Sequence, residues 1–201
     1  MLYYTWLNST ERTIDYDIAT DTIESLGYKI EAAVIDGRRG VREMLLTKGI
    51  PVQNCQFHQQ LTITHCLTKR PKLIQNQELR SIALTLTKTN KVQLKVNLDD
   101  WYDKHGIWLK ERDLITKQYV HRRTRQAYFS LRRNLPYLFT YQQTETKITS
   151  KGIAIPNTTN ALDGRFGVWK GRLNSHRGCS KKLKTKILIS FFSRTTDTKN
   201  N

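Results

Sequence analysis

The hydrophobic positions of residues 1–57 change repeatedly between helical and strand spacing. Apolar residues between positions 14 and 26 recur at helical intervals, and a glycine follows where a helix would end. Residues 28–35 alternate apolar and polar side chains, which is typical of a strand. A second helix is predicted over residues 40–48 and a second strand over residues 50–55. This order predicts a sheet covered by helices.

The pattern after residue 57 is helical. Aromatic residues punctuate four predicted helices, which cover residues 59–69, 77–88, 92–112 and 117–133. A turn-rich connector runs to residue 156. Asn160 then offers a helix N-cap, and a last basic helix is predicted over residues 180–192. The predicted fold class is therefore α/β (α+β), with an all-helical insertion.

These patterns divide the chain into four parts. They are a partial α/β core (1–57), a helical insertion (58–135), a connector that returns to the core and carries two further helices (136–193), and a disordered tail (194–201). No run approaches the ~18 apolar residues of a membrane helix, and no signal peptide is indicated. Three scattered cysteines favour a reducing, cytoplasmic location.

Charge is the strongest compositional signal. Lys and Arg number 34 against 17 acidic residues, which gives a net charge of +17. Residues 1–36 hold two basic and seven acidic side chains, a net of −5, so the remainder has 32 basic and 10 acidic residues, a net of +22. Such a field favours a nucleic-acid partner, because each neutralised phosphate releases counterions. A ribosomal-type binder and a charged, solubilising surface are the alternatives.

Two short motifs offer candidate chemistry. Asp36 follows the first predicted strand and opens an Asp-Gly turn, where a carboxylate would leave the sheet edge. Cys55 and His58 form a C-x₂-H motif about twenty residues later. With His65 and Cys66 they offer thiolate and imidazole ligands for zinc. Packing or hydrogen bonding beside an active site is the preferred interpretation of this motif.

The order of these motifs resembles that of the Mutator-like bacterial insertion-sequence transposases. The resemblance rests on V-I-D-G-R-R-G-V-R-E-M-L, I-P-V-Q-N-C-Q-F-H, I-P-N-T-T-N-A-L-D-G-R-F and H-R-G-C-S, and it extends from about Trp6 to Phe192. The resemblance implies a ribonuclease-H-like fold, which is incomplete in this sequence. It also implies an Asp-Asp-Glu triad that holds two divalent ions, Mg²⁺ or Mn²⁺.

The resemblance assigns roles to individual residues. Asp36 matches the second acid, and Cys55 and His58 match the C-x₂-H signature. Asp163 falls at the third-acid position, where the family usually carries Glu, so its carboxylate is one methylene shorter. The family's first acid lies on a strand before the first predicted helix, and only ten residues precede that helix here. We therefore expect an N-terminally truncated transposase that binds DNA but is inactive alone.

The expected partner is double-stranded DNA, both transposon ends and target, with self-association on DNA and no membrane contact. A bacterial, nucleoid-associated location follows from the resemblance. The predicted DNA-binding residues lie in basic clusters beside the acids: Arg38, Arg39, Arg122, Arg123, Arg125, Arg165, Lys170, Arg172, Arg177, Lys181 and Lys182. The alternatives are a non-catalytic nucleic-acid-binding or regulatory protein derived from a transposase, and a ribonuclease-H-like nuclease with a different role.

Overall fold

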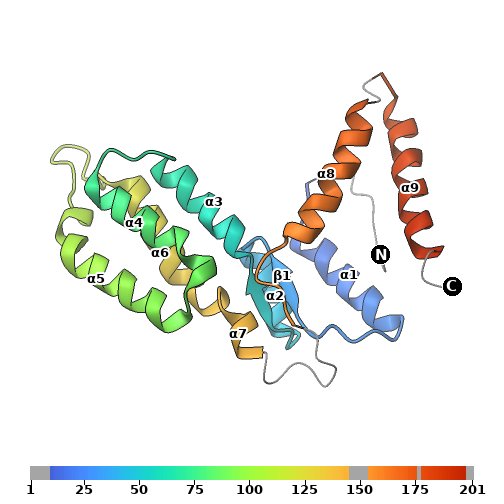
Figure 1. Ribbon diagram of the computed structural model, residues 1–201, viewed down its shortest axis with the longest axis horizontal. Coiled ribbons are helices and arrows are strands. Elements are labelled where there is room, and N and C mark those ends of the chain that lie inside the picture. Colours follow the sequence, from blue (N-terminus) through green and yellow to red (C-terminus); the bar gives the residue numbers. More distant parts are fainter. Residues whose placement is uncertain (1–9, 145–153, 176–177, 198–201) are drawn as a thin grey trace. The chain divides into compact units, whose positions relative to one another are not determined.

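The computed structural model describes residues 10–144, 154–175 and 178–197 (Figure 1). These residues form mostly helices, with one two-stranded parallel sheet. The chain divides into two compact units. We call Glu31–Thr159 the central unit, and the segments Met1–Ile30 and Asn160–Asn201 together the terminal unit.

The central unit begins with a small β-α-β layer. Strand β1 (Ala33–Ile35) leads into helix α2 (Arg39–Thr47), and strand β2 (Val52–Asn54) returns parallel to β1. The buried apolar residues Val41 and Leu45 line one side of α2.

No ribonuclease-H-like sheet is evident in the described residues, because the only ladder has two strands. The strand predicted over residues 28–35 is reduced to its last three residues. Its pairing partner β2 provides only three residues before the chain turns into the next helix.

The rest of the central unit is a helical block. Helices α3 (Gln56–Leu67), α4 (Ile74–Leu84), α5 (Lys91–Leu109) and α6 (Arg122–Asn134) lie side by side in Figure 1. Short 3-10 turns η1 (Leu86–Lys88) and η2 (Leu135–Tyr137) and helix α7 (Thr140–Thr144) complete it. The main core lies here, where α3 packs on α4 and α6 and α4 packs on α5. Its fully buried members include Ile63, Leu79, Leu94, Leu98, Leu131 and Phe139.

Three sequence-based boundaries differ from the structure. The predicted helix 117–133 begins only at Arg122, because Arg112 and Tyr119 form an antiparallel bridge and Lys117 has a left-handed backbone (φ 57°). The predicted helix 77–88 ends at Leu84 and resumes as η1. The expected division between residues 57 and 58 falls inside α3, so the β-α-β layer and the helical block share a helix.

The terminal unit consists of helices α1 (Thr13–Ser25), α8 (Asn160–Ser175) and α9 (Lys181–Asp197). Ile14 and Ile18 of α1 are about half exposed, and Phe166 meets Trp169 edge-on within α8. Helix α9 includes the first four residues of the tail that was predicted to be disordered from residue 194. In the part of the chain that the structure describes, no helix is long and apolar enough to cross a membrane.

Ion pairs across the helical block should make its stability sensitive to acid. Glu78 on α4 accepts a hydrogen bond from Lys104 Nζ and pairs with His105 Nε2, both at 2.6 Å. These bonds, that from Lys104 foremost, hold the pKa of Glu78 below its usual value. The pKa of Asp99 is also lowered, first by its bond from Lys95. A carboxylate with a lowered pKa stabilises the fold above the unfolded pKa, and this contribution is lost as pH falls through the folded pKa.

We therefore expect the urea midpoint to fall as pH drops below about 4.3, the ordinary Glu value. Glu78→Gln should reduce this fall, because the substituted side chain no longer titrates. Asp103→Asn, at an exposed position on α5, is the matched control and should leave the fall as it is. An unchanged pH profile for Glu78→Gln would contradict the assignment of acid sensitivity to this pair.

Candidate active site and nucleic-acid interface

Asp36 directly follows β1 and is exposed to solvent. Gly37 then adopts a left-handed backbone (φ 96°), a conformation that side chains with a Cβ rarely adopt. The chain enters α2 two residues later. The Asp-Gly turn thus places a carboxylate at the carboxyl end of a parallel strand, where ions and solvent reach it.

Cys55 follows β2 at the same end of the sheet. Its backbone N–H donates to the Ile35 carbonyl at 2.7 Å, directly before Asp36. The register pairs Ile35 with Asn54, so Asp36 and Cys55 come directly after paired residues. Both motifs singled out in the sequence therefore lie at one end of the β layer.

Thr159 contacts both members of the C-x₂-H motif. Its backbone N–H and its Oγ1 lie 3.3 and 3.5 Å from Cys55 Sγ, and Oγ1 lies 3.4 Å from His58 Nδ1. Two residues earlier, Asn157 Nδ2 donates to Gln56 Oε1, and the Asn157 carbonyl accepts from the Gln56 N–H, each at 3.0 Å. These bonds join segments 101 to 104 positions apart.

The Cys55 thiol is buried and hydrogen-bonded. Burial acts to raise its pKa, but the bonds with Thr159 and His58 together outweigh burial, so the pKa of Cys55 lies below its usual value. Cys55 Sγ therefore acts as a hydrogen-bond acceptor for the returning chain.

The zinc alternative, with His65 and Cys66 added to the C-x₂-H motif, finds no support in the described residues, where no three such side chains are grouped so that they could hold a metal ion. His65 lies seven residues beyond His58 on the same helix, about 10 Å along its axis. Zinc bonds to imidazole and thiolate are only about 2.0–2.3 Å long. Cys66 instead packs against the core of the helical block, where burial raises the pKa of its thiol.

Sequence reasoning missed a chain of buried amides that supports this end of the sheet. Gln53 Nε2 donates to the carbonyls of Asn54 and Leu138, and its Oε1 accepts from the Tyr141 N–H at 3.0 Å. Gln56 Nε2 also donates to the Leu138 carbonyl, at 2.9 Å. These bonds fasten β2 and the start of α3 to the segment that follows α6.

The amide chain continues along α3 to the basic helix α6. Gln59 bonds Ser130 and Asn134 of α6, and Asn134 Oδ1 accepts from Arg42 of α2 at 2.9 Å. The available signal was compositional, since residues 53–60 contain four Gln and one Asn. Burial of that segment makes every such amide require a partner.

One amide in this segment is an exception. The side chain of Asn54 is 1% exposed, and neither its Oδ1 nor its Nδ2 has a hydrogen-bond partner among the described residues. Asn54 ends β2, beside Ile35 and one residue before Cys55.

Asp163 lies in the first turn of α8 and is exposed. It belongs to the terminal unit, whereas Asp36 belongs to the central unit. The approach of these two carboxylates stays a prediction. The described residues contain no group of three or more His, Cys, Asp or Glu side chains that could hold a metal ion.

The predicted DNA-binding residues differ in their surroundings. Arg39 pairs with Glu43 at 2.6 Å, and this hydrogen bond foremost raises the pKa of Arg39, so part of its charge is compensated. Arg125 is half-buried and stacks on two aromatic rings. Arg39 is nevertheless exposed, as are Arg38, Arg122, Arg123, Lys170, Arg172 and Lys182. Arg177 and the side chains of Arg165 and Lys181 lie outside the described residues.

Comparisons of this chain with protein-family models, with curated proteins and with solved structures found no match.

Proposed function

We propose that this chain is part of a DNA transposase that resembles the Mutator-like bacterial insertion-sequence transposases. Its chemistry would be cleavage of DNA strands at element ends and their transfer to target DNA. Asp36 would serve as the second acid and Asp163 as the third, on an incomplete ribonuclease-H-like core. The partner would be duplex DNA, on which copies of the chain would associate.

The contact of Thr159 with Cys55 and His58 carries this proposal. The resemblance implies a C-x₂-H signature, then a helical insertion, then a T-T-N segment that leads to the last acid. In the structure a helical block separates these two motifs in sequence, and the motifs bond to each other. Asp36 directly follows Ile35, whose carbonyl accepts from the Cys55 N–H. Asp163 comes four residues after Thr159.

The donor chemistry of the two acids fits Mg²⁺ or Mn²⁺. Carboxylate oxygens are the ligands that these hard cations prefer, and both Asp36 and Asp163 are exposed. When bound, a pair of such ions supplies an activated attacking oxygen and stabilises the leaving oxygen of DNA. Cys55 and His58 would position the segment that leads to Asp163, since both contact Thr159.

Mn²⁺ titration followed by NMR tests the site without requiring activity. The paramagnetic ion broadens backbone signals close to where it binds. We expect broadening around both Asp36 and Asp163 at the same Mn²⁺ concentration, and Asp36→Asn should abolish it at both positions. Asp103→Asn, at an exposed acid of the helical block, is the matched control and should change neither.

Two outcomes would contradict the proposed site. Broadening at only one of the two acids would separate them. Broadening that survives Asp36→Asn would place the ion elsewhere. DNA binding together with either outcome would favour the non-catalytic nucleic-acid-binding alternative.

A further inference from the structure

The connection between α5 and α6 is a preformed loop. Asp113 Oδ1 accepts from the N–H groups of Ile115 and Thr116 and from the Thr116 hydroxyl, and these bonds, those from Thr116 foremost, lower the pKa of Asp113. The Asp113 N–H donates to the Gln118 carbonyl at 2.9 Å. Tyr119 therefore leaves the loop in a fixed position, one turn before α6.

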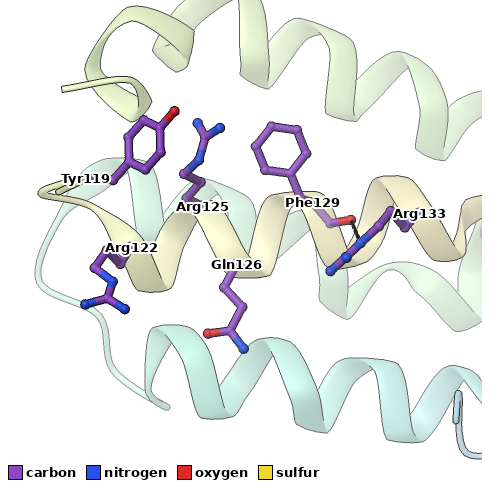
Figure 2. A pocket seen from close by; sticks show the side chains of 6 residues that line it. All are labelled: Tyr119, Arg122, Arg125, Gln126, Phe129 and Arg133. Atoms are coloured by element: carbon purple, nitrogen blue, oxygen red, sulfur yellow. Dashed lines mark hydrogen bonds between the residues drawn. The ribbon is translucent and has the colours of Figure 1, made fainter. Parts of the chain in front are cut away.

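Tyr119 is held by two arginines. The guanidinium carbons of Arg112 and Arg125 lie 4.1 and 3.9 Å from the centre of its ring, and Arg112 Nη2 donates to the Tyr119 hydroxyl at 2.8 Å. Arg125 also lies over the Phe129 ring, at 4.8 Å. The result is a ladder in which arginine side chains alternate with aromatic rings, and Figure 2 draws three of its members, Tyr119, Arg125 and Phe129, beside α6.

Tyr119, Arg125 and Phe129 of this ladder line one side of a pocket of about 390 Å³. Its other lining residues are Arg122, Gln126 and Arg133, which follow one face of α6 (Figure 2). No acidic side chain lines it. Arg122 donates to Gln118 and Arg133 to the Phe129 carbonyl, so among the described bonds each uses one of its five N–H donors.

Rings and arginines together in one shallow, open site match a nucleotide better than a bare phosphate. Phosphates of a paired duplex need only cations, because their bases are stacked inside the helix. An unpaired base offers a flat face that stacks on aromatic rings or on guanidinium planes. The aromatic rings that line the site would suit a base, and Arg122 and Arg133 would suit the flanking phosphates.

We propose that this pocket binds an unpaired nucleotide of a DNA strand. The inference rests on the DNA partner of the proposed function but not on its acids. It assigns the helical block a role in holding a strand that has left the duplex, next to the paired DNA bound by the surrounding basic surface.

The test compares two fluorescein-labelled probes at one salt concentration: a fully paired duplex and the same duplex with a three-nucleotide single-stranded extension. We expect the extended probe to bind roughly tenfold more tightly, within the range that stacking of one base contributes. Arg125→Lys keeps the charge but removes the planar group, and Phe129→Leu removes the ring. Each should reduce this gain to about twofold or less, whereas Arg70→Lys, an exposed arginine outside the pocket, should retain it.

Circular dichroism of each variant checks folding, and the two pocket variants provide independent readings. Equal affinity of the native chain for both probes would overturn the inference while leaving duplex binding, and so the proposed function, intact. Failure to bind either probe at low salt would overturn both. Three further outcomes would assign the pocket to something other than a DNA strand. The first is a gain that survives both pocket variants. The others are tighter binding of an RNA extension and equal competition by a free deoxynucleoside monophosphate.

Discussion

The affinity of this chain for duplex DNA should fall roughly a thousandfold or more when salt rises from about 50 to about 200 mM, the loss expected if six to ten phosphates are neutralised. The physical reason is the net charge of +22 after residue 36, together with exposed cations such as Arg122, Arg123 and Lys170. Fluorescence anisotropy with a labelled duplex of random sequence measures it. Little preference among duplex sequences is expected, since phosphate contacts carry no base information.

A single substitution sharpens this salt test. Arg122→Gln should flatten the slope of log affinity against log salt by about 0.9, the share of one phosphate contact. Arg70→Gln removes the same charge outside the proposed interface and should flatten it less. Equal changes for both would mean that net charge, rather than the α6 surface, guides the chain to DNA. Absence of binding at low salt would remove DNA as the partner.

Trp101→Ala should destabilise the central unit by about 3–5 kcal/mol, the usual cost of emptying a buried aromatic site. Trp101 on α5 is 3% exposed, its ring stacks on Tyr128 of α6 at 5.2 Å, and its Nε1 donates to the Gln75 carbonyl at 3.0 Å. The substitution leaves a cavity and removes the donor to the partly buried Gln75 carbonyl. Urea unfolding followed by circular dichroism measures the free energy of unfolding.

The matched control for this stability test lies on the same helix. Ile107 of α5 is 92% exposed, so Ile107→Ala should change the free energy of unfolding by no more than about 0.5 kcal/mol. Similar small effects at both positions would show that the core of the helical block contributes little to stability. A loss of DNA affinity in Trp101→Ala alone would follow from the displacement of α6, because Tyr128 faces Trp101 from that helix.

Hydrophobic spacing predicted the helices well where their own packing determines them. The helix expected over residues 92–112 is Lys91–Leu109, and that over 59–69 is Gln56–Leu67. It failed for residues 117–121, where Asp113 caps a loop and two arginines hold Tyr119. Helical spacing does not record such side-chain bonds. Residues 28–32 likewise alternate apolar and polar side chains but do not pair as a strand, because a strand also requires a partner of matching length.

For the candidate site, the motifs were found but most of their contacts were not. The spacing of Cys55 and His58 makes their motif recognisable in the sequence. Their bonds to Thr159 were not predictable in this way, because they join residues more than a hundred positions apart. The burial of Gln53, Gln56 and Gln59 was not predicted, because only the fold brings these amides inside. Arg125 was predicted from charge alone, and its stacking between two rings became visible only in the structure.

The paired bonds between Gln56 and Asn157 have a consequence for how this protein can vary. The chain leaves the β layer at Gln56 and comes back beside it at Asn157, and these two residues bond to each other. The helical block is therefore attached like an inserted domain whose two ends are adjacent. Closing a longer loop between fixed ends costs only about 0.6 kcal/mol for each doubling of its length. Related chains can therefore carry blocks of quite different size at this point while Asp36 and Thr159 keep their local contacts. The proposed nucleotide-binding face belongs to the block and would change with it, independently of the acids.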